Sequence, residues 1–260
     1  MVKLKWVLPS CVFLIYCYML APVLIVFPIS ITEQQYVVFP PTGFTLKWYE
    51  SFFNSQEFVQ SLYLSLRLSV SATVIATVLG TAVAVALVRH RFPGQAPLKA
   101  FFISPIIVPG LVLGLAMLIF FGPTLLQGTF TALLIAHIVV ILPYVIRVVS
   151  ANLVGLDIRL DQAAQSLGAS RLQVFRTITL PLLRPGIIAG AILAFVQSFD
   201  ELVVSLFLTG PNLSTLPVSI YHYIEYNSDP TIAAISVIVV VISTTVILLT
   251  ERIVGLSQFL

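Results

Sequence analysis

Long apolar stretches alternate with short polar connections along the whole chain, and this pattern indicates the class of fold. The apolar stretches cover about residues 7–30, 59–88, 98–121, 128–149, 186–208 and 231–250. A helix needs about 20 mostly apolar residues to cross the roughly 30 Å of hydrocarbon in a bilayer. All six stretches reach that length, so the pattern predicts an all-α polytopic membrane protein with six transmembrane helices.

The composition agrees with this interpretation. Apolar residues make up 59% and charged residues 9% of the 260 positions, whereas an ordinary soluble domain is about 25% charged. A water-soluble fold of this size cannot bury so much apolar surface, so lipid must cover part of it. We therefore treat residues 1–260 as a single transmembrane domain.

The basic residues predict the orientation of the spans. Eleven of the thirteen fall on one side: Lys3, Lys5, Arg89, Arg91, Lys99, Arg147, Arg159, Arg171, Arg176, Arg184 and Arg252. The loops on the other side, residues 31–57 and 209–230, contain only Lys47 among basic residues. Loops rich in lysine and arginine stay in the cytoplasm. Both termini and residues 150–185 are therefore predicted to be cytoplasmic.

The sequence offers no pattern typical of catalysis or of metal binding. His90, His137 and His222 stand apart from one another, without the spacing of a zinc motif, a nucleophile elbow or a phosphate-binding glycine loop. Basic residues do not alternate with aromatic ones as in nucleic-acid-binding proteins. We expect no catalytic residue, no metal site, no cofactor bound by the chain itself and no nucleic-acid partner.

A polar helical segment with small side chains interrupts the apolar pattern at about residues 157–185. Asp157 is placed to cap a helix there, and Asp161 lies in the first turn, where a negative charge complements the helix dipole. Ala163, Ala164 and Gly168 fall about one turn apart, so another surface can approach the backbone closely. Glycine weakens a helix by about 1 kcal/mol relative to alanine, so we expect a break at Gly168.

Two interpretations of this segment remain open from the residues alone. It is either a docking element for another protein or an amphipathic helix that lies on the membrane surface. In both, Leu180-Pro181 and Arg184-Pro185-Gly186 are predicted to turn the chain back into the fifth span.

The spacing Gln162-Ala163-Ala164, then Gly168, then Ile178-x-Leu180-Pro181 resembles the EAA signature of permease subunits in binding-protein-dependent ABC importers. Gln162 stands where that family usually has Glu, so a salt bridge made by that Glu becomes a neutral hydrogen bond or passes to Asp161. The resemblance implies a type I importer permease fold. It also implies that the residues from Asp161 to Pro181 couple the chain to an ATPase.

Further stretches resemble spermidine/putrescine importer permeases. They are Ser104-Pro105-Ile106-Ile107-Val108-Pro109-Gly110 and Ser198-Phe199-Asp200-Glu201. The resemblance implies a multi-pass protein of the bacterial inner membrane that forms half of a polyamine pathway. Its implied partners are homodimeric ATPase subunits that hold ATP and magnesium, a second homologous permease, an extracytoplasmic solute-binding protein and the surrounding lipid.

Asp200 and Glu201 are predicted to lie in the outer half of the fifth span, with Gln197 one turn earlier. Carboxylates at such depth are costly, so they usually face a cavity, a partner or an opposite charge. They line the path of a cationic solute, are neutralised by Arg67 from the second span, or contact another subunit. These interpretations overlap, because one carboxylate can pair with Arg67 while the other lines the path.

Two other functions remain possible. The same importer class can carry ferric iron, an amino acid or a phosphonate. A channel or a secondary transporter outside the ABC class is the more distant alternative, since it does not need the Ala-Ala-Gly docking segment.

Overall fold

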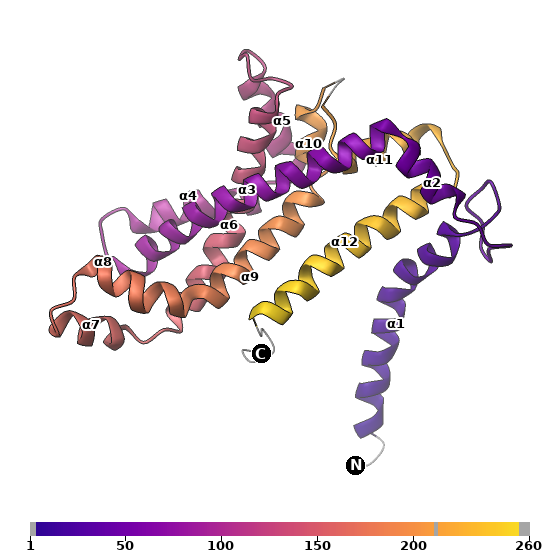
Figure 1. Ribbon diagram of the computed structural model, residues 1–260. Coiled ribbons are helices and arrows are strands. Elements are labelled where there is room, and N and C mark those ends of the chain that lie inside the picture. The colour runs from indigo at the N-terminus through magenta and orange to yellow at the C-terminus, as the bar shows by residue number, and fades with distance from the viewer. Residues whose placement is uncertain (1–3, 211–212, 255–260) are drawn as a thin grey trace. The chain divides into compact units, whose positions relative to one another are not determined.

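The computed structural model describes residues 4–210 and 213–254, and the side chains of residues 7–210 and 213–248. The side chains of Lys3, Lys5 and Arg252, which support the predicted orientation of the termini, lie outside this range. The elements in chain order (Figure 1) are α1 (Leu4–Ser30), α2 (Lys47–Asn54), α3 (Gln56–Arg89), α4 (Gln95–Ile107), α5 (Gly110–Phe121), α6 (Phe130–Val154), α7 (Ile158–Ser166), α8 (Arg171–Val174), the π-helical segment η1 (Phe175–Thr179), α9 (Leu180–Phe199), α10 (Val203–Leu208), α11 (Leu216–Tyr226) and α12 (Thr231–Val254).

The predicted class of fold is confirmed for the described residues. Five helical stretches there are long and apolar enough to cross a membrane: Val7–Ser30, Gln56–Arg89, Phe130–Val154, Arg171–Phe199 and Thr231–Leu248. The pair α4 and α5 gives a sixth crossing if it is counted as one broken span. The chain is an all-α polytopic membrane protein.

The predicted span over residues 98–121 is a broken one in the structure. α4 ends at Ile107, α5 begins at Gly110, and the two axes differ by 105°. A proline disfavours the helical conformation of the residue before it. Val108, which precedes Pro109, is accordingly extended with ψ 129°, so the break arises at this pair.

The predicted fifth span is also interrupted. α9 ends at Phe199 and the chain resumes as the short helix α10 at Val203. Asp200 leaves the α-helical conformation at φ −93° and ψ 4°, while its N–H still bonds back to the carbonyl of Val196. The acidic pair therefore lies at a helix break and not inside a continuous helix.

The predicted chain reversal at Leu180-Pro181 and Arg184-Pro185-Gly186 is wrong. The chain continues from α8 through η1 into α9 as one helical stretch, Arg171–Phe199. A proline ring clashes with the carbonyl four residues earlier in an α-helix. For Pro181 that residue is Thr177, which lies in the wider π-helical turn of η1, and this turn lets the helix continue past the proline.

Contacts divide the described residues into two units, residues 61–210 and 213–218 with 245–254, and residues 4–60 with 219–244. The larger unit is built around α6, against which α3, α4, α9 and α10 pack. A Cβ atom on Gly80 of α3 would lie 2.8 Å from the Val145 side chain, and one on Gly190 of α9 would lie 3.5 Å from the Val145 Cα. These glycines permit the close helix contacts typical of membrane proteins.

In the smaller unit, the polar loop after α1 is fixed by side chains of α2. The indole nitrogen of Trp48 donates a hydrogen bond to the Thr32 carbonyl at 2.7 Å. The hydroxyls of Tyr49 and Ser30 lie 2.7 Å apart. This unit contributes none of the predicted site residues.

Candidate functional site

The predicted helix of the 157–185 segment is α7, and its start and end follow from local sequence. The Asp157 carboxylate accepts the N–H of Arg159 at 2.9 Å, which caps the first turn as predicted. Gly168 has φ +92°, a left-handed conformation that glycine adopts without strain. The predicted break at Gly168 is therefore confirmed, and Ser170 caps the next helix by accepting the Gln173 N–H.

One side of α7 is not covered by the rest of the chain. α7 contains no buried residue, Gln162, Ala163 and Gly168 are exposed, and Leu167 is 90% exposed. A Cβ atom on Gly168 would meet nothing within 4 Å. These four residues form what we call the α7 surface.

Asp161 ties α7 to two other helices. Its Oδ2 lies 3.4 Å from Nη2 of Arg89, the last residue of α3. Its Oδ1 accepts a hydrogen bond from the Thr179 hydroxyl in η1 at 3.1 Å. α7 is thereby joined both to the end of α3 and to the helical stretch that continues into α9.

The sequence located Asp161 but not its partners, because Arg89 and Thr179 are distant along the chain. The signal in the sequence was limited to a basic residue at the end of an apolar run. An ion pair is present at Asp161, next to the Gln162 that occupies the usual Glu position. Ala164, Ile178, Leu180 and Pro181 are half-buried, and the last three belong to η1 and α9 and not to α7.

Breaking the Arg89–Asp161 pair is expected to destabilise the larger unit. The side chains of the pair are only 13% and 15% exposed, and removing one partner of a buried ion pair costs about 3–5 kcal/mol because the other charge is left uncompensated. Arg89→Met and Asp161→Asn should each lower the thermal unfolding midpoint, and the double variant should lose less than the sum of the two. Arg91→Met removes an exposed neighbouring charge and should change little. Additive losses in this double-mutant cycle would show that the two residues do not interact.

The acidic pair at the break between α9 and α10 divides into two roles. The Glu201 Oε1 accepts the Val204 N–H at 3.0 Å, and the Gln197 side chain lies close to this carboxylate. Glu201 therefore supplies a hydrogen-bond acceptor to a free backbone N–H group in the first turn of α10. Asp200 is exposed, and its carboxylate has no hydrogen-bond or ion-pair partner among the described residues.

Arg67 does not neutralise either carboxylate in this structure. Its guanidinium lies over the ring of Phe130, 4.6 Å from the centroid, which is a favourable cation–π contact. Within the described side chains, the one ion pair closer than 4 Å joins Arg89 and Asp161. The structure thus brings Gln197 to Glu201 but does not bring Arg67 to the acidic pair.

A buried histidine holds the two sides of the break together. His137 of α6 is 1% exposed, and its Nδ1 lies 2.8 Å from Ser198 Oγ in α9, while its Nε2 lies 3.0 Å from Ser205 Oγ in α10. Ser205 donates its only hydroxyl hydrogen to the Glu201 carbonyl, so it accepts from Nε2–H. Nδ1 of the neutral ring then accepts from Ser198.

Sequence reasoning missed this role of His137 because the histidine has no partner nearby in the chain. The available signal was a polar side chain in the middle of an apolar span, which usually faces a polar partner inside the protein. The hydrogen bonds of His137 and Glu201 fix the positions of the end of α9 and the start of α10, so the break is an ordered structure and not a frayed helix end.

Comparison with known proteins assigns a family to these features. Residues 76–257 match the family model described as "Binding-protein-dependent transport system inner membrane component". The spermidine/putrescine transport system permease protein PotC of Escherichia coli K12 is 34% identical over 239 residues, which cover 92% of this chain and 90% of that protein. The putrescine transport system permease protein PotI of the same strain is 32% identical and covers 86% of this chain and 82% of its own length.

A solved structure shares the fold. One chain in the crystal structure of a bacterial alginate ABC transporter, in complex with an alginate-pentasaccharide-bound periplasmic protein, has a TM-score of 0.77. The match covers 97% of this chain and 96% of that chain at 15% identity. Because the family model covers most of the chain and PotC matches nearly all of it, this chain belongs to the family of binding-protein-dependent transport system inner membrane components.

Proposed function

We propose that this chain is the transmembrane subunit of an ATP-driven importer and forms half of a pathway for polyamines such as spermidine and putrescine. The observation that supports it best is the likeness to polyamine permeases along almost the entire chain. As a subunit of this family, the chain acts by forming a membrane pathway and not by catalysis.

The energy for transport comes from a separate ATPase that docks on the α7 surface. In this proposal, homodimeric ATPase subunits hold ATP and magnesium, and the chain itself binds no cofactor. The exposed small residues Ala163 and Gly168 let a partner helix approach the backbone. The Asp161 contacts with Arg89 and Thr179 then transmit a movement of α7 to α3 and to the α8–α9 stretch.

Transport follows from alternating access. ATP binding closes the ATPase dimer and draws the docked α7 segments together, and the spans open outward to receive solute from an extracytoplasmic binding protein. A second homologous permease completes the pathway. Both termini and α7 are cytoplasmic in this arrangement, and lipid covers the exposed apolar side chains of the spans.

Asp200 is the residue proposed to meet the cationic solute. Its carboxylate is exposed and unpaired at the helix break, whereas the Glu201 carboxylate accepts a hydrogen bond from the Val204 N–H in α10. An unpaired carboxylate forms strong charge-assisted hydrogen bonds with ammonium groups. Gln197 lies next to the pair and adds a polar group on the same side.

The proposed function is tested by purifying the tagged chain in mild detergent with its co-expressed neighbours. We expect an ATPase, a second permease chain and polyamine-stimulated ATP hydrolysis in the presence of the loaded binding protein. An associated ATPase that responds to ferric iron, an amino acid or a phosphonate but not to polyamines would contradict the cargo. A chain that repeatedly purifies alone would contradict the importer assignment.

Asp200→Asn and Glu201→Gln are expected to separate transport from folding. Asp200→Asn should reduce polyamine uptake about tenfold or more, the effect of losing a hydrogen bond to a charged group, while the unfolding midpoint stays unchanged. Glu201→Gln weakens the hydrogen bond to Val204 and should lower the unfolding midpoint instead. Uptake that is unaffected by Asp200→Asn would exclude the pathway role of this residue.

A further inference from the structure

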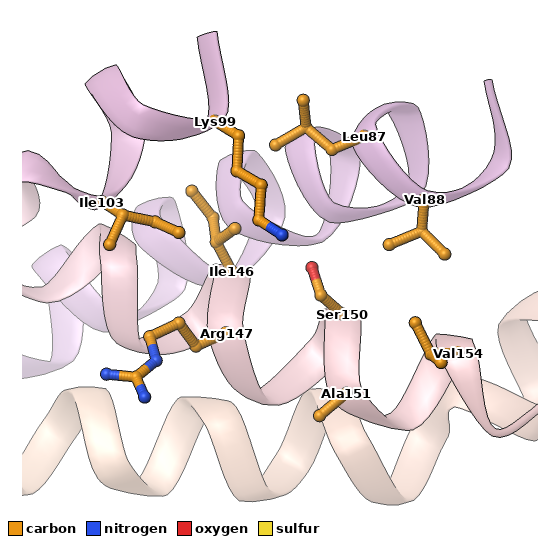
Figure 2. A pocket seen from close by; sticks show the side chains of 9 residues that line it. All are labelled: Leu87, Val88, Lys99, Ile103, Ile146, Arg147, Ser150, Ala151 and Val154. Atoms are coloured by element: carbon orange, nitrogen blue, oxygen red, sulfur yellow. The ribbon is translucent and has the colours of Figure 1, made fainter. Parts of the chain in front are cut away.

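A pocket of about 590 Å³ lies between α3, α4 and α6 in the larger unit. It is lined by Leu87, Val88, Lys99, Ile103, Ile146, Arg147, Ser150, Ala151 and Val154 (Figure 2). None of these residues belongs to the α7 surface or to the helix break. The proposed function makes no use of this pocket.

The polar groups of the pocket are two cations and a hydroxyl, and the rest of its wall is apolar. Figure 2 shows the Lys99 ammonium group pointing toward the Ser150 hydroxyl, while the Arg147 guanidinium extends away from Lys99. Lys99 and Arg147 are both exposed. Over the part of the chain whose side chains are described, no carboxylate lies within 4 Å of either cation. The pocket therefore carries two positive charges that no described carboxylate compensates.

The pocket lies at one end of the spanning helices. Leu87 and Val88 immediately precede the end of α3, and Lys99 lies in the second turn of α4, just after the short connection from α3. Arg147 is seven residues from the end of α6, or about 10 Å at the helical rise of 1.5 Å per residue. Long basic side chains at that depth reach the headgroup level while their aliphatic stems stay in apolar surroundings.

We propose that this pocket binds an anionic phospholipid. Lys99 contacts the phosphate beside the Ser150 hydroxyl, Arg147 adds a second positive charge at the edge of the pocket, and the apolar wall around Ile103 and Ile146 receives the first part of an acyl chain. Basic pockets between transmembrane helices near the cytoplasmic surface are typical sites for anionic headgroups. The apolar wall selects a lipid over free phosphate, because an inorganic ion would leave those side chains without contacts.

The full chain, reconstituted in nanodiscs of phosphatidylglycerol and phosphatidylcholine and then released into mild detergent, tests the proposal. Native mass spectrometry counts the lipids that stay bound. We expect selective retention of phosphatidylglycerol. The double variant Lys99→Gln with Arg147→Gln should weaken the retention of phosphatidylglycerol about twenty-fivefold, from a contribution of about fivefold for each of the two charges.

Two further variants separate charge from folding. Lys99→Arg with Arg147→Lys keeps both charges and should retain the lipid. Arg176→Gln with Arg184→Gln removes two exposed charges outside the pocket and should retain it as well. Retention by Lys99→Gln with Arg147→Gln equal to that of the unmodified chain would overturn the proposal, as would equal retention of both lipids.

The remaining outcomes identify other occupants. Displacement of the lipid by excess inorganic phosphate would assign the cations to a free anion and overturn the proposal. Loss of the lipid when the chain assembles with its co-purified partners would assign the pocket to a protein contact. Retention in the assembled complex is the expected result.

Discussion

Replacing Gly168 with arginine is expected to abolish co-purification of the ATPase and ATP-dependent uptake. Gly168 lies on the exposed α7 surface with open space around it, so an arginine side chain would project to where a docking partner must approach. The substitution also forces φ +92° on a residue with a Cβ, which costs about 1–2 kcal/mol. Co-purification of the ATPase and uptake into proteoliposomes measure the effect.

Gly128→Arg is the matched control for this variant. Gly128 also has a positive φ, +71°, and also has nothing within 4 Å of a Cβ atom, but it lies in the loop between α5 and α6. Its backbone strain is similar, so Gly128→Arg is expected to lose as much thermal stability as Gly168→Arg. It should still co-purify with the ATPase. If Gly168→Arg leaves the ATPase bound and uptake intact, the α7 surface is not the docking site.

Replacing His137 with leucine is expected to destabilise the larger unit and to stop transport. The leucine removes both ring nitrogens. The buried Ser198 hydroxyl loses its acceptor, at a cost of about 1–3 kcal/mol, whereas Ser205 loses the Nε2–H donor and keeps its own hydrogen bond to the Glu201 carbonyl. The contact that holds α9 and α10 on the two sides of the break is then lost. We expect a marked fall in the unfolding midpoint, and a loss of uptake larger than the loss of folded protein.

His222→Leu is the control, because His222 is exposed and should tolerate the change. His137→Asn keeps one donor and one acceptor and should recover part of the stability that His137→Leu loses. An unfolding midpoint for His137→Leu equal to that of the unmodified chain would show that the two hydrogen bonds contribute nothing to the break.

Several features of the fold follow from sequence because they depend on residues close together in the chain. The lengths of the apolar runs predicted α1, α3, α6 and α12, and the cap at Asp157 and the break at Gly168 were both local signals. The small-residue segment that contains α7 was located in the same way, from small residues one helical turn apart. Orientation, the partners and the role of the α7 surface stay predictions that the experiments above test.

Other features depended on which residues meet in three dimensions. The sequence alone determined that the chain is a polytopic α-helical membrane protein with a small-residue segment between two spans, because hydrophobic length and helix capping are local properties. Only the tertiary structure decided that Asp161 pairs with Arg89, that Arg67 lies over Phe130 and not beside the acidic pair, and that His137 joins the two sides of the break. The reason is physical: each of these outcomes is set by packing and hydrogen bonding between segments whose separation along the chain leaves no periodic signal.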